Sequence, residues 1–245
     1  MFKNLFLNSN KESDFNKINY QTFSSEASLK EYDKAYLRSF EEPVVEKYFK
    51  KGAFILDLGC GAGRTTAVLY QRGFQIIGVD IAESLIGLAE KRHPGIDFQI
   101  GDAANLNFAH STFDIVFFSF NGLDYLHPIG KRFKAIKEIR RVLKPNGLFV
   151  YSSHNAFSIP MTKMSFKTFF DNLFSLRIFS SYRLEKLAIG NLLTYHGNLF
   201  KEIKDLEKSG FKFMDIFGFG RATRSKNKFL LSLFFKYISY VFQKV

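Results

Sequence analysis

Cysteine is nearly absent from this chain of 245 residues, and long apolar runs are missing altogether. Cys60 is the single cysteine, which excludes an internal disulfide and a metal site built from several cysteines. No uninterrupted apolar segment approaches the roughly 18 residues of a membrane-spanning helix. The N-terminus turns polar within ten residues, so no signal peptide is expected. These absences favour a soluble protein of the cytoplasm and predict no bound metal.

The formal net charge of +12 is unevenly distributed along the chain. Residues 1–154 hold 20 Lys and Arg against 17 Asp and Glu, whereas residues 155–245 hold 15 against 6. A basic half indicates an anionic partner, such as a phosphorylated substrate, nucleic acid or an acidic membrane surface. A Lys-rich but merely solvated surface explains the same excess, so charge alone leaves the partner open.

Short apolar runs alternate with amphipathic segments from about residue 53 onward. Strands are predicted over 53–58, 74–80, 96–102, 113–120 and 148–153, with helices over 65–73, 83–93 and 131–143. Most of the strands are apolar throughout, as strands covered on both faces are. The alternation therefore predicts an α/β protein with a doubly wound, mostly parallel sheet and helices on both faces.

The whole chain is interpreted as a single domain with four parts. Residues 1–50 form an N-terminal helical cap, and residues 51–155 form the alternating core. Residues 156–195 interrupt the alternation as a Phe-rich insertion. Residues 196–245 supply a last helix, which ends at a glycine, and a C-terminal pair of strands.

The stretch ILDLGCGAGRTT, residues 55–66, follows the first predicted strand. Ligands in doubly wound sheets bind at the carboxyl ends of the strands, where glycines bring backbone close to the ligand. The dinucleotide fingerprint requires G-x-G-x-x-G, but here the glycines are Gly59, Gly61 and Gly63. Asp57, two residues before the first glycine, suits a ligand with a cationic end better than a pyrophosphate.

This D-x-G-x-G-x-G motif resembles the first motif of class I S-adenosylmethionine-dependent methyltransferases. Further motifs follow in family order: Asp80 ends the second strand, Gly101-Asp102-Ala103 follows the third, and FDIVFFSFNGLDYL resembles the fourth motif. EIRRVLKPNGLFVYSS resembles the helix, turn and fifth strand after it. The resemblance covers residues 40–155 strongly and the C-terminal LEKSGFKFMDIFGF more weakly.

The resemblance implies a Rossmann-like sheet of seven strands in the order 3-2-1-4-5-7-6, with strand 7 antiparallel, and S-adenosyl-L-methionine as the cofactor. Asp80 would bind both ribose hydroxyls, since a carboxylate offers two acceptors to a diol. Asp102 would bind the adenine amino group, and Ile81 would pack on the base. The full set of expected cofactor-binding residues is Asp57, Gly59, Gly61, Gly63, Asp80, Ile81, Asp102, Ala103 and Ser119.

A general base is needed only if the methyl acceptor carries a proton at working pH. His154 directly follows the fifth strand and is the predicted base. The alternatives lie in the loop after the fourth strand, before the last helix, or in the N-terminal segment: Asn121, Asp124, Tyr125, His127, His196, Tyr20, Tyr32 and Tyr36. Asp114 starts the fourth strand at the opposite edge and is interpreted as a turn or cap residue.

The insertion is predicted to be a helical substrate lid. Phe166, Phe169, Phe170, Leu173 and Phe174 have helical spacing and form one apolar stripe. The stripe either packs on the core, lines an apolar substrate pocket, or docks on a membrane with help from nearby Lys and Arg.

Three functions remain open. The first is methyl transfer to a small molecule, on a hydroxyl oxygen of a sugar, a polysaccharide precursor or a lipid-like compound; this acceptor would be anionic or lipid-linked, with the enzyme peripheral to the inner membrane face. The second is methylation of nucleic acid or protein. SFNG at residues 119–122 lacks the prolines of N-P-P-[YF], which argues against nucleic acid. The third is a non-catalytic cofactor-binding module. The presence of Asp57, Asp80 and Asp102 argues against it.

Overall fold

The structure is a computed structural model, and it describes residues 17–25, 35–156, 181–187, 190–218 and 235–245. The core begins with α3 (Glu42–Tyr48), β1 (Phe54–Leu58), α4 (Arg64–Gln71), β2 (Gln75–Asp80), α5 (Glu83–Arg92) and β3 (Asp97–Ile100). It continues with β4 (Phe113–Phe118), η1 (Gly122–Tyr125), α6 (Ile129–Val142) and β5 (Leu143–Asn155). The remaining elements are β6 (Ser181–Leu187), β7 (Gly190–Gly197), α8 (Leu199–Lys208), β8 (Phe211–Gly218) and β9 (Tyr237–Lys244).

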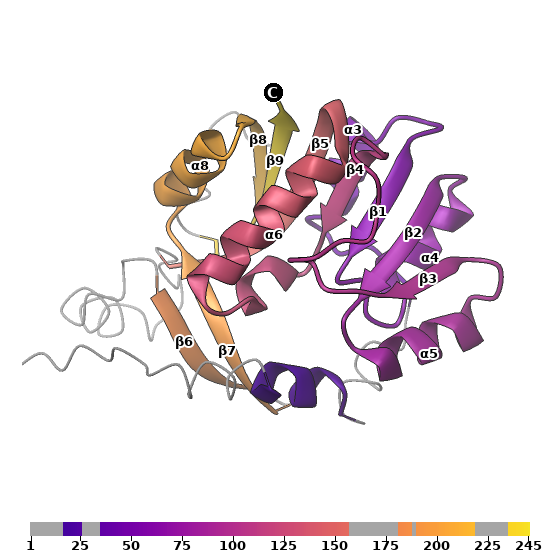
Figure 1. The fold of residues 1–245 in the computed structure, drawn as a ribbon, viewed down its shortest axis with the longest axis horizontal. Helices are drawn as coiled ribbons and strands as arrows, with labels where there is room; N and C mark the ends of the chain where they lie inside the picture. Colours follow the sequence, from indigo (N-terminus) through magenta and orange to yellow (C-terminus); the bar gives the residue numbers. More distant parts are fainter. Residues whose placement is uncertain (1–16, 26–34, 157–180, 188–189, 219–234) are drawn as a thin grey trace, which may run out of the picture.

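Seven strands form the sheet that the sequence predicts, in the order β3-β2-β1-β4-β5-β9-β8. The first five pair in parallel, and β9 runs antiparallel between β5 and β8. β9 thus takes the place of the expected antiparallel seventh strand. The expected strand order is confirmed, and the C-terminal pair is a hairpin inserted beside β5 (Figure 1).

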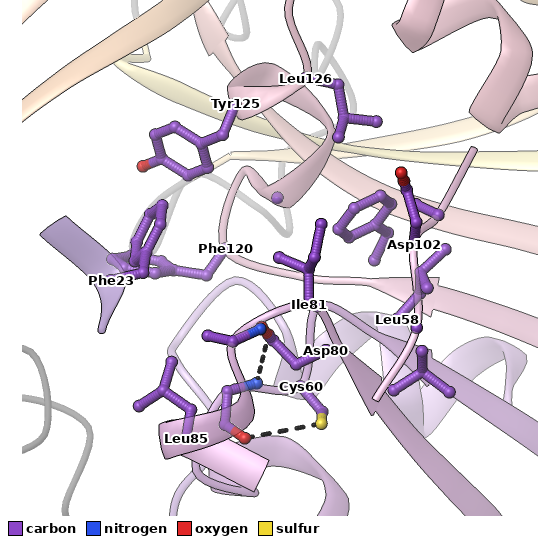
Figure 2. A pocket seen from close by; sticks show the side chains of 18 of the residues that line it. Phe23, Leu58, Cys60, Asp80, Ile81, Leu85, Asp102, Phe120, Tyr125 and Leu126 are labelled. Atoms are coloured by element: carbon purple, nitrogen blue, oxygen red, sulfur yellow. Dashed lines mark hydrogen bonds between the residues drawn. The ribbon is translucent and has the colours of Figure 1, made fainter. Parts of the chain in front are cut away.

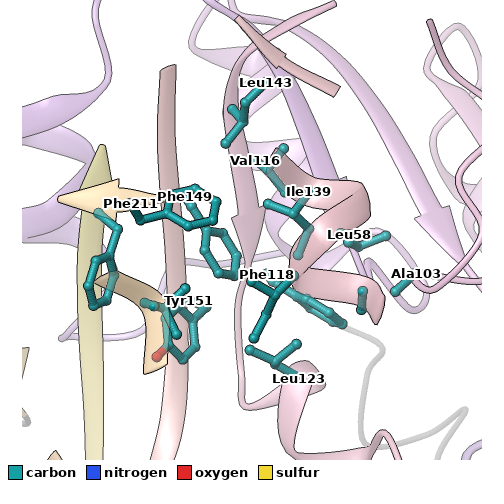
Figure 3. Close-up of a cluster of buried hydrophobic side chains, with 14 of the residues drawn as sticks. Leu58, Ala103, Val116, Phe118, Leu123, Ile139, Leu143, Phe149, Tyr151 and Phe211 are labelled. Atoms are coloured by element: carbon teal, nitrogen blue, oxygen red, sulfur yellow. The ribbon is translucent and has the colours of Figure 1, made fainter. Parts of the chain in front are cut away.

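Apolar side chains cover both faces of this sheet. On one face, Ile136 and Ile139 of α6 and Leu206 of α8 pack on residues of β4, β5 and β9, as Figure 3 shows for Ile139, Val116 and Phe149. On the other face, α3 and α4 cover the sheet through the second apolar cluster. Strands buried on both faces explain why their sequences are apolar throughout rather than alternating.

The described part of the insertion is a β-hairpin, β6 and β7, where a helical lid was expected. β7 pairs in parallel with the end of β5, at His154 and Asn155. Because β9 occupies one edge of β5 along this stretch, β7 lies on the other edge, beyond the last residue of β4 that pairs with β5. The hairpin therefore extends the sheet over the carboxyl end of β4. The apolar stripe from Phe166 to Phe174 lies outside the described residues.

A short helix over residues 17–23 lies against the hairpin, although the two are far apart in the sequence (Figure 1). The Asn19 side-chain amide donates to the carbonyls of Leu193 (3.0 Å) and Tyr125 (3.1 Å). Its oxygen accepts from the backbone N–H of Leu193 at 2.8 Å. Asn19 thus pairs with β7 as an added strand would, and it joins the N-terminal cap to the insertion.

None of the helices in the described part of the chain combines the length and the apolar character needed to span a bilayer.

Candidate active site

A pocket lies at the carboxyl edge of β1, β2, β3 and β4, where the sequence places its motifs. Seven of the ten positions predicted for the site line it: Gly59, Gly61, Asp80, Ile81, Asp102, Ala103 and Ser119. Figure 2 shows Asp80 and Ile81 at its centre, with Phe23 and Tyr125 on one side and Asp102 and Leu126 on the other. Asp57, Gly63 and His154 do not line it.

The glycine loop after β1 needs glycine for two separate reasons. Gly59, Gly61 and Gly63 all have positive φ, between 56° and 85°, which side chains with a Cβ rarely adopt. A Cβ on Gly59 would also lie 2.6 Å from the ring of Phe118. The loop is held against β2 because Gly59 N–H donates to the carbonyl of Val79 at 2.7 Å. Bare backbone is therefore presented to the pocket in a fixed shape.

Asp80 is the acidic group at the centre of the pocket. Its Oδ2 accepts from the N–H of Gly61 (2.8 Å) and its Oδ1 accepts from the N–H of Ala82 (2.9 Å). Burial raises the pKa of this carboxyl, and these backbone N–H groups oppose the rise. Each oxygen keeps further acceptor capacity, so the carboxylate suits a diol that lies across both oxygens.

Asp102 stands at the far end of the pocket from the glycine loop. Its Oδ1 accepts from the N–H of Ala104 at 2.9 Å, and its Oδ2 pairs with the ammonium of Lys131 at 3.0 Å. Between Asp80 and Asp102, the Ile81 side chain is 48% exposed and lines the cavity. A large apolar side chain exposed inside a pocket suits the face of a planar base, with an acceptor oxygen at its edge.

Asp57 lies beneath the glycine loop rather than in the pocket. The hydroxyls of Thr65 and Thr66 both donate to its Oδ2 at 2.6 Å, whereas its Oδ1 is buried without a hydrogen-bond partner. Burial raises the pKa of Asp57 to about 6. An unpaired, buried carboxylate oxygen next to the loop fits a ligand with a cationic end, and it would disfavour a pyrophosphate. Direct contact between Asp57 and a ligand stays a prediction.

Sequence reasoning missed a buried ion pair at the start of α4. The Arg64 guanidinium donates to both oxygens of Glu41, at 2.8 and 2.6 Å, and to the carbonyl of Tyr36 at 2.8 Å. Ser119, predicted to bind the cofactor, donates its hydroxyl to the same Glu41. Arg64 and Ser119 both line the pocket. The ion pair ties the segment before α3 to the glycine loop, and no local pattern in the sequence announces it.

His154, the predicted base, is buried behind the pocket wall. Its Nδ1 lies 2.9 Å from Oδ2 of Asp124, and its ring packs against the His196 ring at 4.9 Å between centroids, with the two planes tilted by 40°. The ring of Tyr125, which lines the pocket, lies 6.4 Å from the His154 ring. His154 as the base stays a prediction.

The other candidate bases divide between the pocket and the interior. Tyr20 and Tyr125 line the pocket, and Phe23 beside them packs edge-on against Tyr125 at 5.0 Å. Tyr32 lies outside the described residues. Asp114 sits at the other edge, where it accepts from the N–H of Phe54 and pairs with Lys144, as a structural residue would. Asn121, Asp124, His127, His196 and Tyr36 do not line the pocket.

Among the described residues there is no group of His, Cys, Asp and Glu that could hold a metal ion. The described lining combines acceptors for a diol and an amino group with bare backbone and an apolar wall, and the unpaired oxygen of Asp57 lies beneath the glycine loop. The arrangement can bind a nucleoside that carries a charged substituent, and align that substituent with a second molecule.

Comparison with known proteins gives a consistent result. Residues 55–147 match the profile of a family described as "Methyltransferase domain". The uncharacterised protein MJ1252 of Methanocaldococcus jannaschii is 29% identical over 88% of this chain and 87% of its own length. Demethylmenaquinone methyltransferase of Paenarthrobacter aurescens is 32% identical over 46% of this chain, and the match spans only 43% of that enzyme.

A solved structure from Methanosarcina mazei, titled as one of the SAM-dependent methyltransferases, superposes with a TM-score of 0.65. It is 23% identical to this chain and covers 83% of it and 97% of its own chain. At that identity the likeness describes the fold alone.

Proposed function

Because the chain belongs to the class I S-adenosylmethionine-dependent methyltransferases, we propose that it transfers the methyl group to a small-molecule acceptor. The acceptor atom is a hydroxyl oxygen of a sugar, a polysaccharide precursor or a lipid-like compound. Asp80, at the centre of the pocket with Oδ2 bound to the N–H of Gly61 in the glycine loop and Oδ1 bound to the N–H of Ala82, is the observation that carries the proposal. Demethylmenaquinone, the compound named for one relative, is lipid-like, and that name supports the class of the acceptor but not the acceptor atom.

The residues present fit the cofactor. Asp80 would hold the ribose diol, Asp102 the adenine amino group and Ile81 the face of the base. Bare backbone at Gly59 and Gly61 would lie against the charged end, with Asp57 beneath it. When bound, S-adenosylmethionine supplies an electrophilic methyl group that is ready for in-line displacement, so the protein mainly binds, aligns and excludes water.

The described wall opposite the glycine loop favours the lipid-like acceptor over a sugar. Tyr20, Phe23, Phe120, Tyr125 and Leu126 contribute mainly apolar and aromatic surface. Besides the hydroxyls of Tyr20 and Tyr125, this wall contains the side chain of Asn19, which already binds backbone groups with both its oxygen and its nitrogen. A sugar buried against this wall would leave hydroxyls without partners, which is unfavourable, whereas an apolar ring would lose nothing.

The proposal is tested by methyl transfer from isotopically labelled S-adenosylmethionine to a panel of acceptors. The panel contains a lipid-like quinol, a monosaccharide, bulk tRNA and an unfolded protein, each separated by extraction before counting. We expect label in the quinol fraction with the wild type and much less with Asp80→Asn when the cofactor is subsaturating. Asp97→Asn, an exposed acid on β3, is the matched control and should keep full activity.

Each contrary result has a definite meaning. Label in the tRNA or protein fraction alone would replace the small-molecule proposal by methylation of a macromolecule. Tight cofactor binding without label in any fraction, over a wide range of acceptors, would favour a non-catalytic binding module.

A further inference from the structure

Three large apolar side chains are exposed near the starts of α6 and α8. Ile129 is 39% exposed, Phe133 is 37% exposed and Phe200 is 55% exposed. Ile129 and Phe133 are four residues apart, so they stand one above the other on the same side of α6. Exposed apolar residues scattered singly need no explanation, but neighbouring ones on adjacent helices indicate an interaction surface.

Lysines surround these apolar side chains. Lys134 and Lys137 are exposed on α6, and Lys201 and Lys204 are exposed beside Phe200 on α8. Lys137 continues the row of Ile129 and Phe133 at the next turn. α6 as a whole carries six Lys and Arg against one acid, Glu138. Lys131, Arg132 and Arg141 form ion pairs, as Lys201 does with Asp205, so the basic character of this surface comes mainly from Lys134, Lys137 and Lys204. We name these residues the α6–α8 patch: Ile129, Phe133, Lys134, Lys137, Phe200, Lys201 and Lys204.

The two helices that carry the patch are neighbours and are joined at their first turns. Arg132 of α6 and Glu202 of α8 form a buried ion pair that joins the first turns of the two helices. Phe133 follows Arg132 directly, and Phe200 lies two residues before Glu202. Both helices cover the same face of the sheet, as Figure 1 shows.

The patch also borders the pocket. Leu126 and Lys131 line the pocket, and Ile129 lies between them in sequence at the first position of α6. A surface that binds the patch would therefore lie close to the entrance through which an acceptor must pass.

We propose that the α6–α8 patch docks the protein on an anionic lipid surface. Lysines attract acidic headgroups, and Ile129, Phe133 and Phe200 enter the boundary between headgroups and acyl chains. Exposed aliphatic and aromatic side chains set among lysines suit this boundary better than they suit the phosphate backbone of a nucleic acid. The consequence, delivery of a lipid-like acceptor from the bilayer, rests on the proposed function, whereas the docking itself does not.

The absence of tryptophan from the chain gives a direct test. Phe133→Trp introduces a single tryptophan into the patch of the full-length protein, and its fluorescence can be excited selectively in the presence of the 11 tyrosines. With vesicles of equimolar phosphatidylglycerol and phosphatidylcholine, its emission should shift to the blue and be quenched by brominated acyl chains. Tyr70→Trp is the matched control: Tyr70 is 47% exposed on α4, on the opposite face of the sheet. Its emission should not change.

Charge reversal separates the patch from the net charge. The double variant Lys134→Glu with Lys137→Glu should weaken vesicle binding by about thirtyfold. Each lysine near an anionic surface contributes roughly fivefold to binding, and the two contributions multiply. Lys50→Glu with Lys51→Glu makes the same change in net charge at exposed positions before β1 and should have little effect. Binding should also weaken when salt rises from about 0.1 M to about 1 M, which shortens the screening length from ~10 Å to ~3 Å.

Three results would overturn the proposal. One is an unchanged emission of Phe133→Trp at every concentration of anionic vesicles. Another is an equal loss of binding in both charge-reversed proteins, which would leave only a net-charge effect. The third is equal binding to vesicles of pure phosphatidylcholine. None of these readouts uses methyl transfer, so the methyltransferase proposal is tested separately.

Discussion

Asp80 is the residue whose replacement reports most directly on cofactor binding. In Asp80→Asn one acceptor oxygen becomes a donor, so a ribose diol loses a charge-assisted hydrogen bond. The expected loss is about 1.5–3 kcal/mol of binding free energy. Calorimetric titration with S-adenosylhomocysteine measures it, and Asp97→Asn serves as the control. Equal affinity of Asp80→Asn and the wild type would reject the assignment of Asp80.

Asp57 is expected to destabilise the folded protein near neutral pH. Its pKa is raised from 3.8 to about 6 by burial, so the folded state holds this proton more tightly than the unfolded state does. The contribution of Asp57 to the free energy of unfolding is therefore most favourable below about pH 4, and it falls as the pH rises through 6. The penalty above that range is on the order of 3 kcal/mol.

Asp57→Asn removes this penalty, because an amide does not ionise. At pH 8 the variant should unfold at higher urea concentration than the wild type, and the difference should shrink between pH 6 and pH 4. The same variant should bind S-adenosylhomocysteine more weakly if Asp57 acts on the cofactor. A stability difference that stays constant with pH would mean that packing, and not ionisation, causes it.

At the scale of elements, Asn19 joins the helix over residues 17–23 to β7 and to η1. Asn19→Ala removes three hydrogen bonds of a buried side chain, each of which contributes about 0.5–1.5 kcal/mol. Tyr20 and Phe23 on this helix line the pocket, so S-adenosylhomocysteine should dissociate about tenfold faster or more. Limited proteolysis should also cut near residue 25 more readily. Asn191→Ala, exposed on β7, is the control; equal rates in both variants would contradict a fastening role.

Arg132 holds three elements together from the inside. Its guanidinium contacts Asp124 of η1 at 3.1 Å and Glu202 of α8, and all three side chains are nearly inaccessible. Arg132→Met leaves two buried carboxyls without their cation, which costs about 3–5 kcal/mol. Urea unfolding should show this loss, whereas Lys137→Met on the exposed side of α6 should change little. A loss below about 1 kcal/mol would contradict a fastening role of the Arg132 ion pairs.

The sequence predicts secondary structure correctly where the local residue pattern determines it, and not where contacts between distant segments determine it. Apolar runs bounded by glycine and aspartate identified β1, β2, β4 and β5, and the order of the strands followed from the resemblance. The helix was predicted from the Phe spacing over residues 166–174, which lies outside the described residues, so that stripe stays a prediction. The described residues of the insertion, in 181–187 and 190–197, form a hairpin. Pairing of β7 with β5 and with Asn19, rather than local propensity, sets this conformation.

The site residues also divide into those that a local motif predicts and those that it does not. The sequence predicted Gly59, Asp80 and Asp102 because each follows a strand at the spacing of the motifs. Asn19 contacts Leu193 across 174 positions, and Glu41 reaches Ser119 across 78. No periodicity or short motif encodes such a contact, since it depends on how the cap and the insertion fold over the edge of the sheet.

At the scale of the whole molecule, the pocket draws its lining from residue 19 to residue 131. A ligand there contacts the N-terminal cap, the glycine loop and the start of α6 at once, so binding should stabilise one cooperative unit. S-adenosylhomocysteine at a hundredfold excess over its dissociation constant adds about 2.7 kcal/mol. For a chain of this size that corresponds to a rise of roughly 5–11 °C in Tm.

NAD at the same concentration should leave Tm unchanged. Its pyrophosphate would meet the buried Asp57, and the G-x-G-x-G loop lacks the spacing of the dinucleotide fingerprint. The measurement is a thermal scan followed by circular dichroism, with Asp80→Asn as the variant in which the S-adenosylhomocysteine shift should shrink. An equal shift with both nucleotides would contradict the cofactor assignment. A shift with neither nucleotide would contradict the binding of S-adenosylhomocysteine in this pocket.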